Sequence, residues 1–231
     1  MVEWMAGLLI QLRPFVGQLW AALYADREGG RIHKNQIRTA TRWLRALFDS
    51  ASSLWAVRHF RPPKTQAVLA SDASVWGGGA LLYILDAGFE VTAESLRMVR
   101  PWAWMATRWK EEDERRVQIR AGDPKGQARW EAYAAVCAFK RWAAPILEAR
   151  GGATVLGDAL GVLLKMGVLR SKDPRINMLF MELALVLAPT GSSLECLHVC
   201  AEDNTLADEL SRMREGASEP PPESSSSDRV A

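Results

Sequence analysis

Four carboxylates stand at positions that suit a metal-dependent phosphodiesterase. Asp72 ends a short apolar run, and Asp158 directly follows another. Glu131 lies early in an amphipathic segment, and Asp208 lies in a short segment near the end of the chain. Mg²⁺ prefers oxygen ligands, and two such ions about 4 Å apart can stabilise both the attacking and the leaving oxygen of a phosphodiester. These four acids are therefore the first candidates for chemistry.

The same residue types also have a simpler interpretation. An acid at the end of a strand is often only a solvated surface group, and this holds for each of the four acids taken singly. They form a site only if the fold brings them together, so the elements that carry them decide between the two interpretations.

The predicted strands are short apolar runs. Residues 66–71 are long enough for a buried strand and too short for a helix. Residues 76–85 predict a second strand, which forms a hairpin with the first. Three glycines, Gly77 to Gly79, lie inside this strand; no Gly-Lys-Ser/Thr follows them, so we expect close packing or a bulge there rather than a phosphate-binding loop. Further strands are predicted at residues 102–107, 153–157 and 194–200.

Helical periodicity dominates the N-terminal part of the chain. Apolar residues recur at steps of three and four over residues 1–24 and again over residues 35–48. Pro14 is expected to break or kink the first of these helices. Residues 110–120 are dense in charge and are expected to be an exposed stretch.

Two proline-containing helix starts occur in the second half of the chain. Asp123-Pro124 and Asp173-Pro174 each place an acid at the cap and proline at the first helical position. Pro145 is expected to end the helix that carries Glu131. Shorter helices are predicted to end near Leu169 and to span residues 204–213. Alternating strands and helices after a helical preface indicate an α/β fold.

The composition narrows the class of protein. The chain has 231 residues, of which 48% are apolar and 24% charged, as in soluble globular proteins. No apolar stretch is long enough for a membrane span, and the N-terminus lacks the pattern of a secretory signal. Three cysteines cannot all pair, which predicts reduced thiols and a cytoplasmic or nuclear protein that is not secreted.

Charge and composition also predict a division into three parts. Residues 1–64 hold ten Lys or Arg against four acids, whereas residues 65–214 are slightly acidic. A tail at residues 215–231 is rich in Ser, Pro and Glu and is expected to be disordered and dispensable. The basic first part suggests a polyanionic partner. Its candidate contacts with nucleic acid are arginines at helical spacing, Arg38, Arg42 and Arg45, although a solvated helix face would show the same pattern.

Four motifs then resemble one known family. SDASVWGGGALL, RWEAYAAVCAFKRW, TVLGDALGVL and HVCAEDNTLADELSR resemble, in the same order, the motifs of type 1 ribonuclease H domains in retroelements. The resemblance covers residues 66–212. The upstream segments GLLIQLRPFVGQLWAALY and QIRTATRWLRALF resemble the thumb or connection region of retroelement reverse transcriptases, notably DIRS-like ones. No Tyr-x-Asp-Asp polymerase motif occurs in the chain.

The resemblance implies a fold, a reaction and a set of site residues. It implies a ribonuclease H-like five-stranded mixed sheet with flanking helices, preceded by a small helical segment. The implied reaction is hydrolysis of the RNA strand of an RNA·DNA hybrid by a metal-activated water, with two Mg²⁺ ions that Mn²⁺ can replace. The implied catalytic and metal-binding residues are Asp72, Glu131, Asp158 and Asp208.

Two further residues belong to the closing signature. Asn204 stands four residues before Asp208, as the signature requires, and this spacing selects Asp208 over Asp203. His198 has two open interpretations: an auxiliary role in product release or proton transfer, or an ordinary strand residue. The third motif departs from the family pattern because it reads Gly-Asp-Ala, and the glycine after the signature's histidine is replaced near Cys200.

Two alternatives to a hybrid-cleaving enzyme stay open. The chain could be a catalytically degenerate retroelement remnant that only binds nucleic acid. It could also be a DNA-directed nuclease of the same fold, of the integrase or resolvase type, although the Asn-x-x-Ala-Asp-x-Leu-Ser-Arg ending speaks against this. The expected partners are an RNA·DNA hybrid and a reverse transcriptase polymerase domain; no membrane is expected.

Overall fold

The computed structural model describes residues 12–24, 34–50, 64–188 and 194–213. Contacts divide the chain into two compact units, residues 1–59 with 168–191 and residues 60–167 with 192–231. The second unit contains the four candidate acids. Its centre is a five-stranded sheet made of β1 (Thr65–Ala73), β2 (Gly77–Asp86), β3 (Ala103–Arg108), β4 (Arg150–Gly157) and β5 (Leu194–His198).

The strand order confirms the predicted fold class. The strands lie in the order β3-β2-β1-β4-β5, so β1 is at the centre. The first three strands form an antiparallel meander, and β4 and β5 run parallel to β1. This is the mixed sheet expected of a ribonuclease H-like fold. All five predicted strands are present at or close to their predicted positions.

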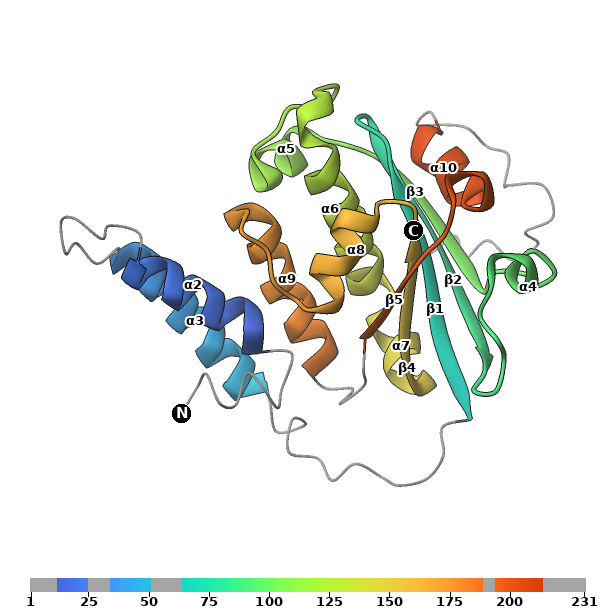
Figure 1. The fold of residues 1–231 in the computed structure, drawn as a ribbon, viewed down its shortest axis with the longest axis horizontal. Helices are drawn as coiled ribbons and strands as arrows, with labels where there is room; N and C mark the ends of the chain where they lie inside the picture. Colours follow the sequence, from blue (N-terminus) through green and yellow to red (C-terminus); the bar gives the residue numbers. More distant parts are fainter. Residues whose placement is uncertain (1–11, 25–33, 51–63, 189–193, 214–231) are drawn as a thin grey trace. The chain divides into compact units, whose positions relative to one another are not determined.

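Helices cover both faces of this sheet. Figure 1 shows α6 and α8 on one face and α4 and α10 on the other. Because β1 is covered on both faces, its residues from Ala67 to Ala73 are all buried, and this explains why the strand is a continuous apolar run without alternation. The helices of this unit are α4 (Ala93–Arg97), α5 (Glu111–Val117), α6 (Gln127–Arg141), α7 (Ala143–Ala149), α8 (Leu160–Gly167) and α10 (Thr205–Arg212).

Two of the three glycines of β2, Gly77 and Gly79, allow α10 to lie directly on the sheet, whereas Gly78 makes room for Trp109 and Ala134. A Cβ added at Gly79 would lie 2.4 Å from the carbonyl oxygen of Ala207, and one at Gly77 would lie 2.8 Å from that of Ser211. Side chains at these positions would push the helix away. The prediction of close packing at the glycine run is therefore confirmed, and it matters here because α10 carries Asp208.

Of three local predictions, one is wrong. Pro14 lies in the first turn of α2 (Arg13–Tyr24), where a missing N–H costs no hydrogen bond; residues 1–11 lie outside the described residues, so the predicted break or kink stays a prediction. The charged stretch after β3 is largely exposed, as predicted, and it forms the helix α5, in which Asp113 accepts a 2.8 Å hydrogen bond from the Lys110 N–H. Pro145 does not end the helix that carries Glu131, because α6 already ends at Arg141 and the proline sits in the first turn of α7.

The described elements of the other unit are helices. It contains α2, α3 (Lys34–Ser50) and α9 (Pro174–Leu187), and the buried amide of Asn177 donates a 2.7 Å hydrogen bond to the Pro14 carbonyl. The predicted boundary near residue 64 adjoins residues 51–63, and the predicted tail 215–231 follows the last described residue. Residues 51–63 and 215–231 lie outside the described residues, so the division into three parts stays a prediction. Among the helices that are described, none is long and apolar enough to cross a membrane.

Candidate metal centre

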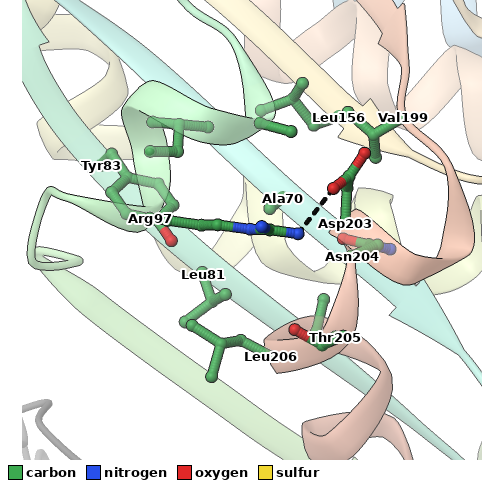
Figure 2. A pocket seen from close by; sticks show the side chains of 13 residues that line it. Ala70, Leu81, Tyr83, Arg97, Leu156, Val199, Asp203, Asn204, Thr205 and Leu206 are labelled. Carbon is green, nitrogen blue, oxygen red and sulfur yellow. Dashed lines mark hydrogen bonds and ion pairs between the residues drawn. The ribbon is translucent and has the colours of Figure 1, made fainter.

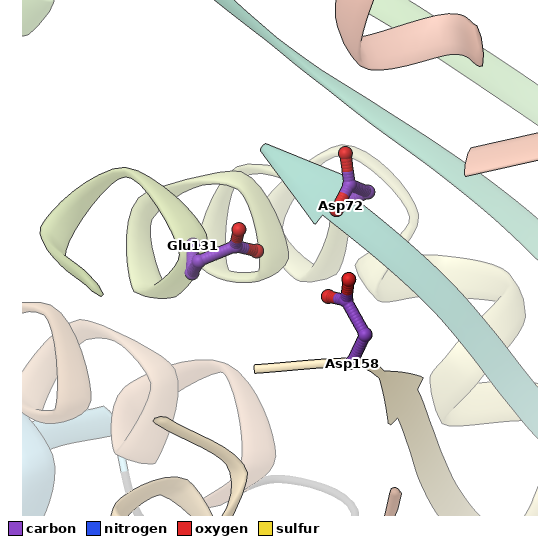
Figure 3. Close-up of side chains that lie close together, drawn as sticks. All are labelled: Asp72, Glu131 and Asp158. Carbon is purple, nitrogen blue, oxygen red and sulfur yellow. The ribbon is translucent and has the colours of Figure 1, made fainter. Parts of the chain in front are cut away.

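Three of the four candidate acids meet at one end of the sheet. One carboxylate oxygen from each of Asp72, Glu131 and Asp158 can be chosen so that all three atoms lie within 4.8 Å of one another. Figure 3 shows the three side chains around one space, with Asp72 at the tip of β1, Glu131 on α6 and Asp158 after β4. Asp72 and Glu131 are buried and Asp158 is half-buried, so the first two are not solvated surface acids.

The parallel pairing of β1 and β4 explains why two of the acids are neighbours. Ala70 on β1 lies opposite Leu156 on β4. Asp72 and Asp158 each follow two residues later, so they reach the same edge of the sheet at the same level. Parallel strands end on one edge, and an acid after each strand places both carboxylates there.

The third acid, Glu131, comes from the helix α6, which packs against β1. Asp123 caps the turn that leads into α6 by accepting a 2.9 Å hydrogen bond from the Lys125 N–H. Glu131 follows in the second turn of α6 and is only 8% exposed. Its carboxylate accepts a 2.6 Å hydrogen bond from the Gln127 amide, which also donates to the carbonyl of Ala73 on β1. Glu131 is thus held against the end of β1.

Burial and mutual repulsion act together on these acids. Burial, reinforced by the charges of Asp72 and Asp158, raises the pKa of Glu131 to about 9, although hydrogen bonds from Gln127 and the Ala73 backbone oppose the rise. Burial also raises the pKa of Asp72, which is 5% exposed; a hydrogen bond from Ser211 opposes this rise, and the charges of Asp158 and Asp208 add to it. Deprotonated, the three groups repel one another at short range.

Asp208 lies outside the group of three. Its carboxylate forms a 2.7 Å ion pair with Arg212, one turn later on α10. It is nevertheless close enough to Asp72 for its charge to act on that residue. The neighbouring acid Asp203 is turned elsewhere and pairs with Arg97 at 2.6 Å.

The two auxiliary candidates both contact the main chain beside the acids. Asn204 is buried, and its amide donates a 3.2 Å hydrogen bond to the carbonyl of Ser71. His198 lies at the end of β5, and its Nε2 is 3.1 Å from the carbonyl oxygen of Asp158. Each therefore touches the backbone of, or next to, one of the acids, whereas neither side chain belongs to the carboxylate group.

The candidate arginines Arg38, Arg42 and Arg45 are exposed on α3, in the helical unit. Arg45 forms a surface ion pair with Asp49 at 3.6 Å. Their common helical face is thus observed, while their partner stays a prediction.

Sequence reasoning missed two residues of this neighbourhood, Gln127 and Ser211. Gln127 stands four residues before Glu131, a spacing that places both side chains on one face of a helix and could have indicated the contact. Ser211 stands three residues after Asp208, and its proximity to Asp72 depends on how α10 packs on the sheet. No local pattern indicates that packing.

A separate pocket lies on the face of the sheet that α4 and α10 cover. Figure 2 shows its apolar floor, which includes Leu81 and Leu156, and the ion pair between Arg97 and Asp203 at its side. Its volume is about 50 Å³, and none of the four candidate acids lines it. The three-acid group therefore lies outside this pocket.

The residues of the three-acid group fit a hard divalent cation. All the donors are carboxylate oxygens, which Mg²⁺ and Mn²⁺ prefer over soft ligands. Two of the three acids are more than nine-tenths buried, and the pKa of each is raised. A cation among the three would offset both the burial and the repulsion that raise these pKa values.

Comparisons with known proteins add little beyond this geometry. No protein-family model and no curated protein matches the chain. Among solved structures, the chain is similar to LC11-RNase H1 isolated from compost, at 17% identity and a TM-score of 0.42, over 63% of this chain and 91% of that one. It is also similar to RNase H1 from the halophilic archaeon Halobacterium salinarum NRC-1, at 14% identity and a TM-score of 0.38, over 63% and 92%. The fold assignment rests on the strand order.

Proposed function

We propose that this chain hydrolyses the RNA strand of RNA·DNA hybrids and depends on a divalent metal for that reaction. The observation that carries the proposal is the convergence of Asp72, Glu131 and Asp158 at the end of the central strand. Three buried or half-buried carboxylates in one place are costly to keep ionised, and a nuclease site is a reason to keep them. The strand order supports the same assignment.

Each acid has a role in this proposal. Asp72, Glu131 and Asp158 would hold Mg²⁺, or Mn²⁺ in its place, and Asp208 would join them as the fourth acid. When bound, the ions lower the pKa of water and stabilise charge on the scissile phosphate. Asp72 would be held by β1 and Asp158 by the residues that follow β4. His198, whose Nε2 lies 3.1 Å from the Asp158 carbonyl oxygen, would assist product release or proton transfer.

The substrate class follows from what such a site can distinguish. Acids that hold a metal at the scissile phosphate do not read bases. Selection would therefore rest on the 2′-hydroxyls of the RNA strand and the groove shape of the hybrid. Exposed Arg38, Arg42 and Arg45 would contribute contacts to phosphates. We further propose that the chain is the C-terminal part of a DIRS-like reverse transcriptase, with a polymerase domain as partner, and that residue 64 separates its connection-like and ribonuclease H-like parts.

A cleavage assay tests this function. Labelled RNA·DNA hybrid, duplex DNA and duplex RNA are each incubated with the protein, with Mg²⁺, with Mn²⁺ and with a chelator. We expect cuts in the RNA strand of the hybrid alone, with 3′-hydroxyl and 5′-phosphate ends, and none with the chelator. Cleavage of duplex DNA would favour the DNA-directed nuclease instead.

One observation favours the second candidate, a degenerate remnant that only binds nucleic acid. The ion pair with Arg212 engages Asp208, the acid that would complete the site. If the protein cuts none of the three substrates with either metal yet retains a hybrid in a gel-shift assay, this second candidate is correct.

A further inference from the structure

Gln127 occupies a special place beside the three-acid group. It is the first residue of α6, one turn before Glu131. Its Nε2 atom lies 2.6 Å from Glu131 Oε1 and also donates to the carbonyl oxygen of Ala73. Ala73 directly follows Asp72 on β1. A single side-chain amide therefore links two of the acids through the elements that carry them.

The chemistry of the amide makes this link specific. An amide NH₂ group has two hydrogens, and here both acceptors are oxygens on different elements. The Ala73 carbonyl orients the amide, and the amide in turn orients the Glu131 carboxylate. A glutamine also adds no charge to the acidic group, so it can hold Glu131 without competing for a cation.

Glu131 needs such a partner because of its surroundings. It is 8% exposed and lies beside Asp72 and Asp158, which repel its charged form. A buried carboxylate without hydrogen bonds is costly, and its side chain would turn away from the like charges. The Gln127 amide favours the charged form of Glu131 and donates a 2.6 Å hydrogen bond to its carboxylate.

We propose that Gln127 is a positioning residue, which holds the Glu131 carboxylate in the geometry that binds a divalent cation with Asp72 and Asp158. The metal-binding part of this inference rests on the proposed function. The hydrogen bond itself is a property of the metal-free protein. The two parts are therefore tested separately.

Metal affinity tests the first part. Gln127→Met keeps the length of the side chain and removes both hydrogen bonds. Gln66→Met is a matched control, because the Gln66 amide likewise donates to two oxygens, the carbonyls of Asp86 and Phe89 at 3.2 and 2.8 Å, and lies at the opposite end of β1 from Asp72. Mn²⁺ binding to the full chain is measured by calorimetry, after thermal melts without metal have shown that both variants fold.

We expect Gln127→Met to weaken Mn²⁺ binding by about tenfold or more, as is usual when a metal ligand loses its hydrogen-bond partner. Gln66→Met should leave the Mn²⁺ affinity within about twofold of wild type, whatever it does to the melt. Equal affinities of the Gln127 variant and wild type would overturn the positioning role. Equal losses in both variants would also overturn it, because they would indicate a general structural effect.

The second part, the hydrogen bond between Gln127 and Glu131, is tested in the metal-free protein with Gln127 left in place. In ¹⁵N-labelled protein, the Gln127 side-chain amide is followed while Glu131 is replaced by Ala. We expect a large change in its proton shifts and faster exchange with water, whereas the Gln66 amide stays unchanged. An unaltered Gln127 signal would contradict the proposal. If wild type binds no Mn²⁺ while the Gln127 signal responds as expected, the metal-dependent function fails and the positioning of Glu131 stands.

Discussion

The amide of Asn204 donates a hydrogen bond to the carbonyl of Ser71, the residue immediately before Asp72. Asn204 is also the N-cap residue of α10, and its own carbonyl accepts a hydrogen bond from the Asp208 N–H at 3.0 Å. One buried side chain thus ties the start of α10 to the end of the central strand. The four-residue spacing between Asn204 and Asp208 has a physical meaning, because it sets Asp208 one helical turn from this anchor.

Replacing Gly79 with alanine should destabilise the fold because a Cβ there would lie 2.4 Å from the Ala207 carbonyl on α10. We expect a loss of about 1–3 kcal/mol in the free energy of unfolding, the range for overpacked sites. Gly161→Ala is the control, since its Cβ would meet nothing within 4 Å and helix propensity should favour it. Urea unfolding of the two variants measures this, and a stable Gly79→Ala protein would show that α10 does not depend on the glycine.

Asp72→Asn should abolish cleavage while leaving the metal-free protein as stable as wild type, or more stable. The substitution removes a charge at a site where burial, and after it the charges of Asp158 and Asp208, raise the pKa of Asp72. It should also shrink the rise in melting temperature that Mg²⁺ produces, because binding to the folded state is weaker. The measurements are cleavage of a labelled hybrid and thermal melts with and without Mg²⁺.

The control for this prediction is Asp203→Asn. Asp203 pairs with Arg97 away from the acidic group, so the variant should keep most of the activity and lose little stability. A wild-type cutting rate in the Asp72→Asn protein would end the assignment of Asp72 as a metal ligand.

Without metal, the stability of the protein should fall as the pH rises from about 4.5 to about 9. The pKa of Glu131 is raised from 4.5 to about 9 by burial and by the charge of Asp72, so the folded protein holds a proton that the unfolded chain releases in this range. A folded state that binds more protons loses stability with rising pH. Glu131→Gln should flatten this dependence. Unfolding measured at several pH values in chelator checks it, and identical slopes in both proteins would contradict it.

Replacing Arg38, Arg42 and Arg45 together with glutamine should weaken hybrid binding and flatten its dependence on salt. All three side chains are exposed on α3, and a variant that neutralises fewer phosphates releases fewer counterions when it binds. Asp49→Asn should act in the opposite direction, because it frees Arg45 from its ion pair. Filter binding over a range of salt concentrations measures both. An unchanged slope in the triple variant would identify these arginines as an ordinary solvated face.

Much of the fold was predictable because its signals are local. Apolar runs identified the five strands, and Asp173-Pro174 marked the start of α9, where Asp173 caps the first turn. Pro145 was misread for a reason that is also local: proline is tolerated in a first turn, and the sequence does not say which turn a proline occupies. The helix α5 was missed because its charged residues share no apolar face.

Residue types and their spacing identified Asp72, Glu131, Asp158 and Asp208 as candidates, because residue chemistry and the order of motifs can be read directly from the sequence. Only the tertiary structure decided which of them meet. Asp72 and Asp158 lie side by side because of the register between β1 and β4. Asp208 pairs with Arg212 and does not belong to the group that the other three acids form. Register and side-chain direction arise from contacts between residues far apart in sequence, and the Gln127 amide that joins β1 to α6 is one such contact.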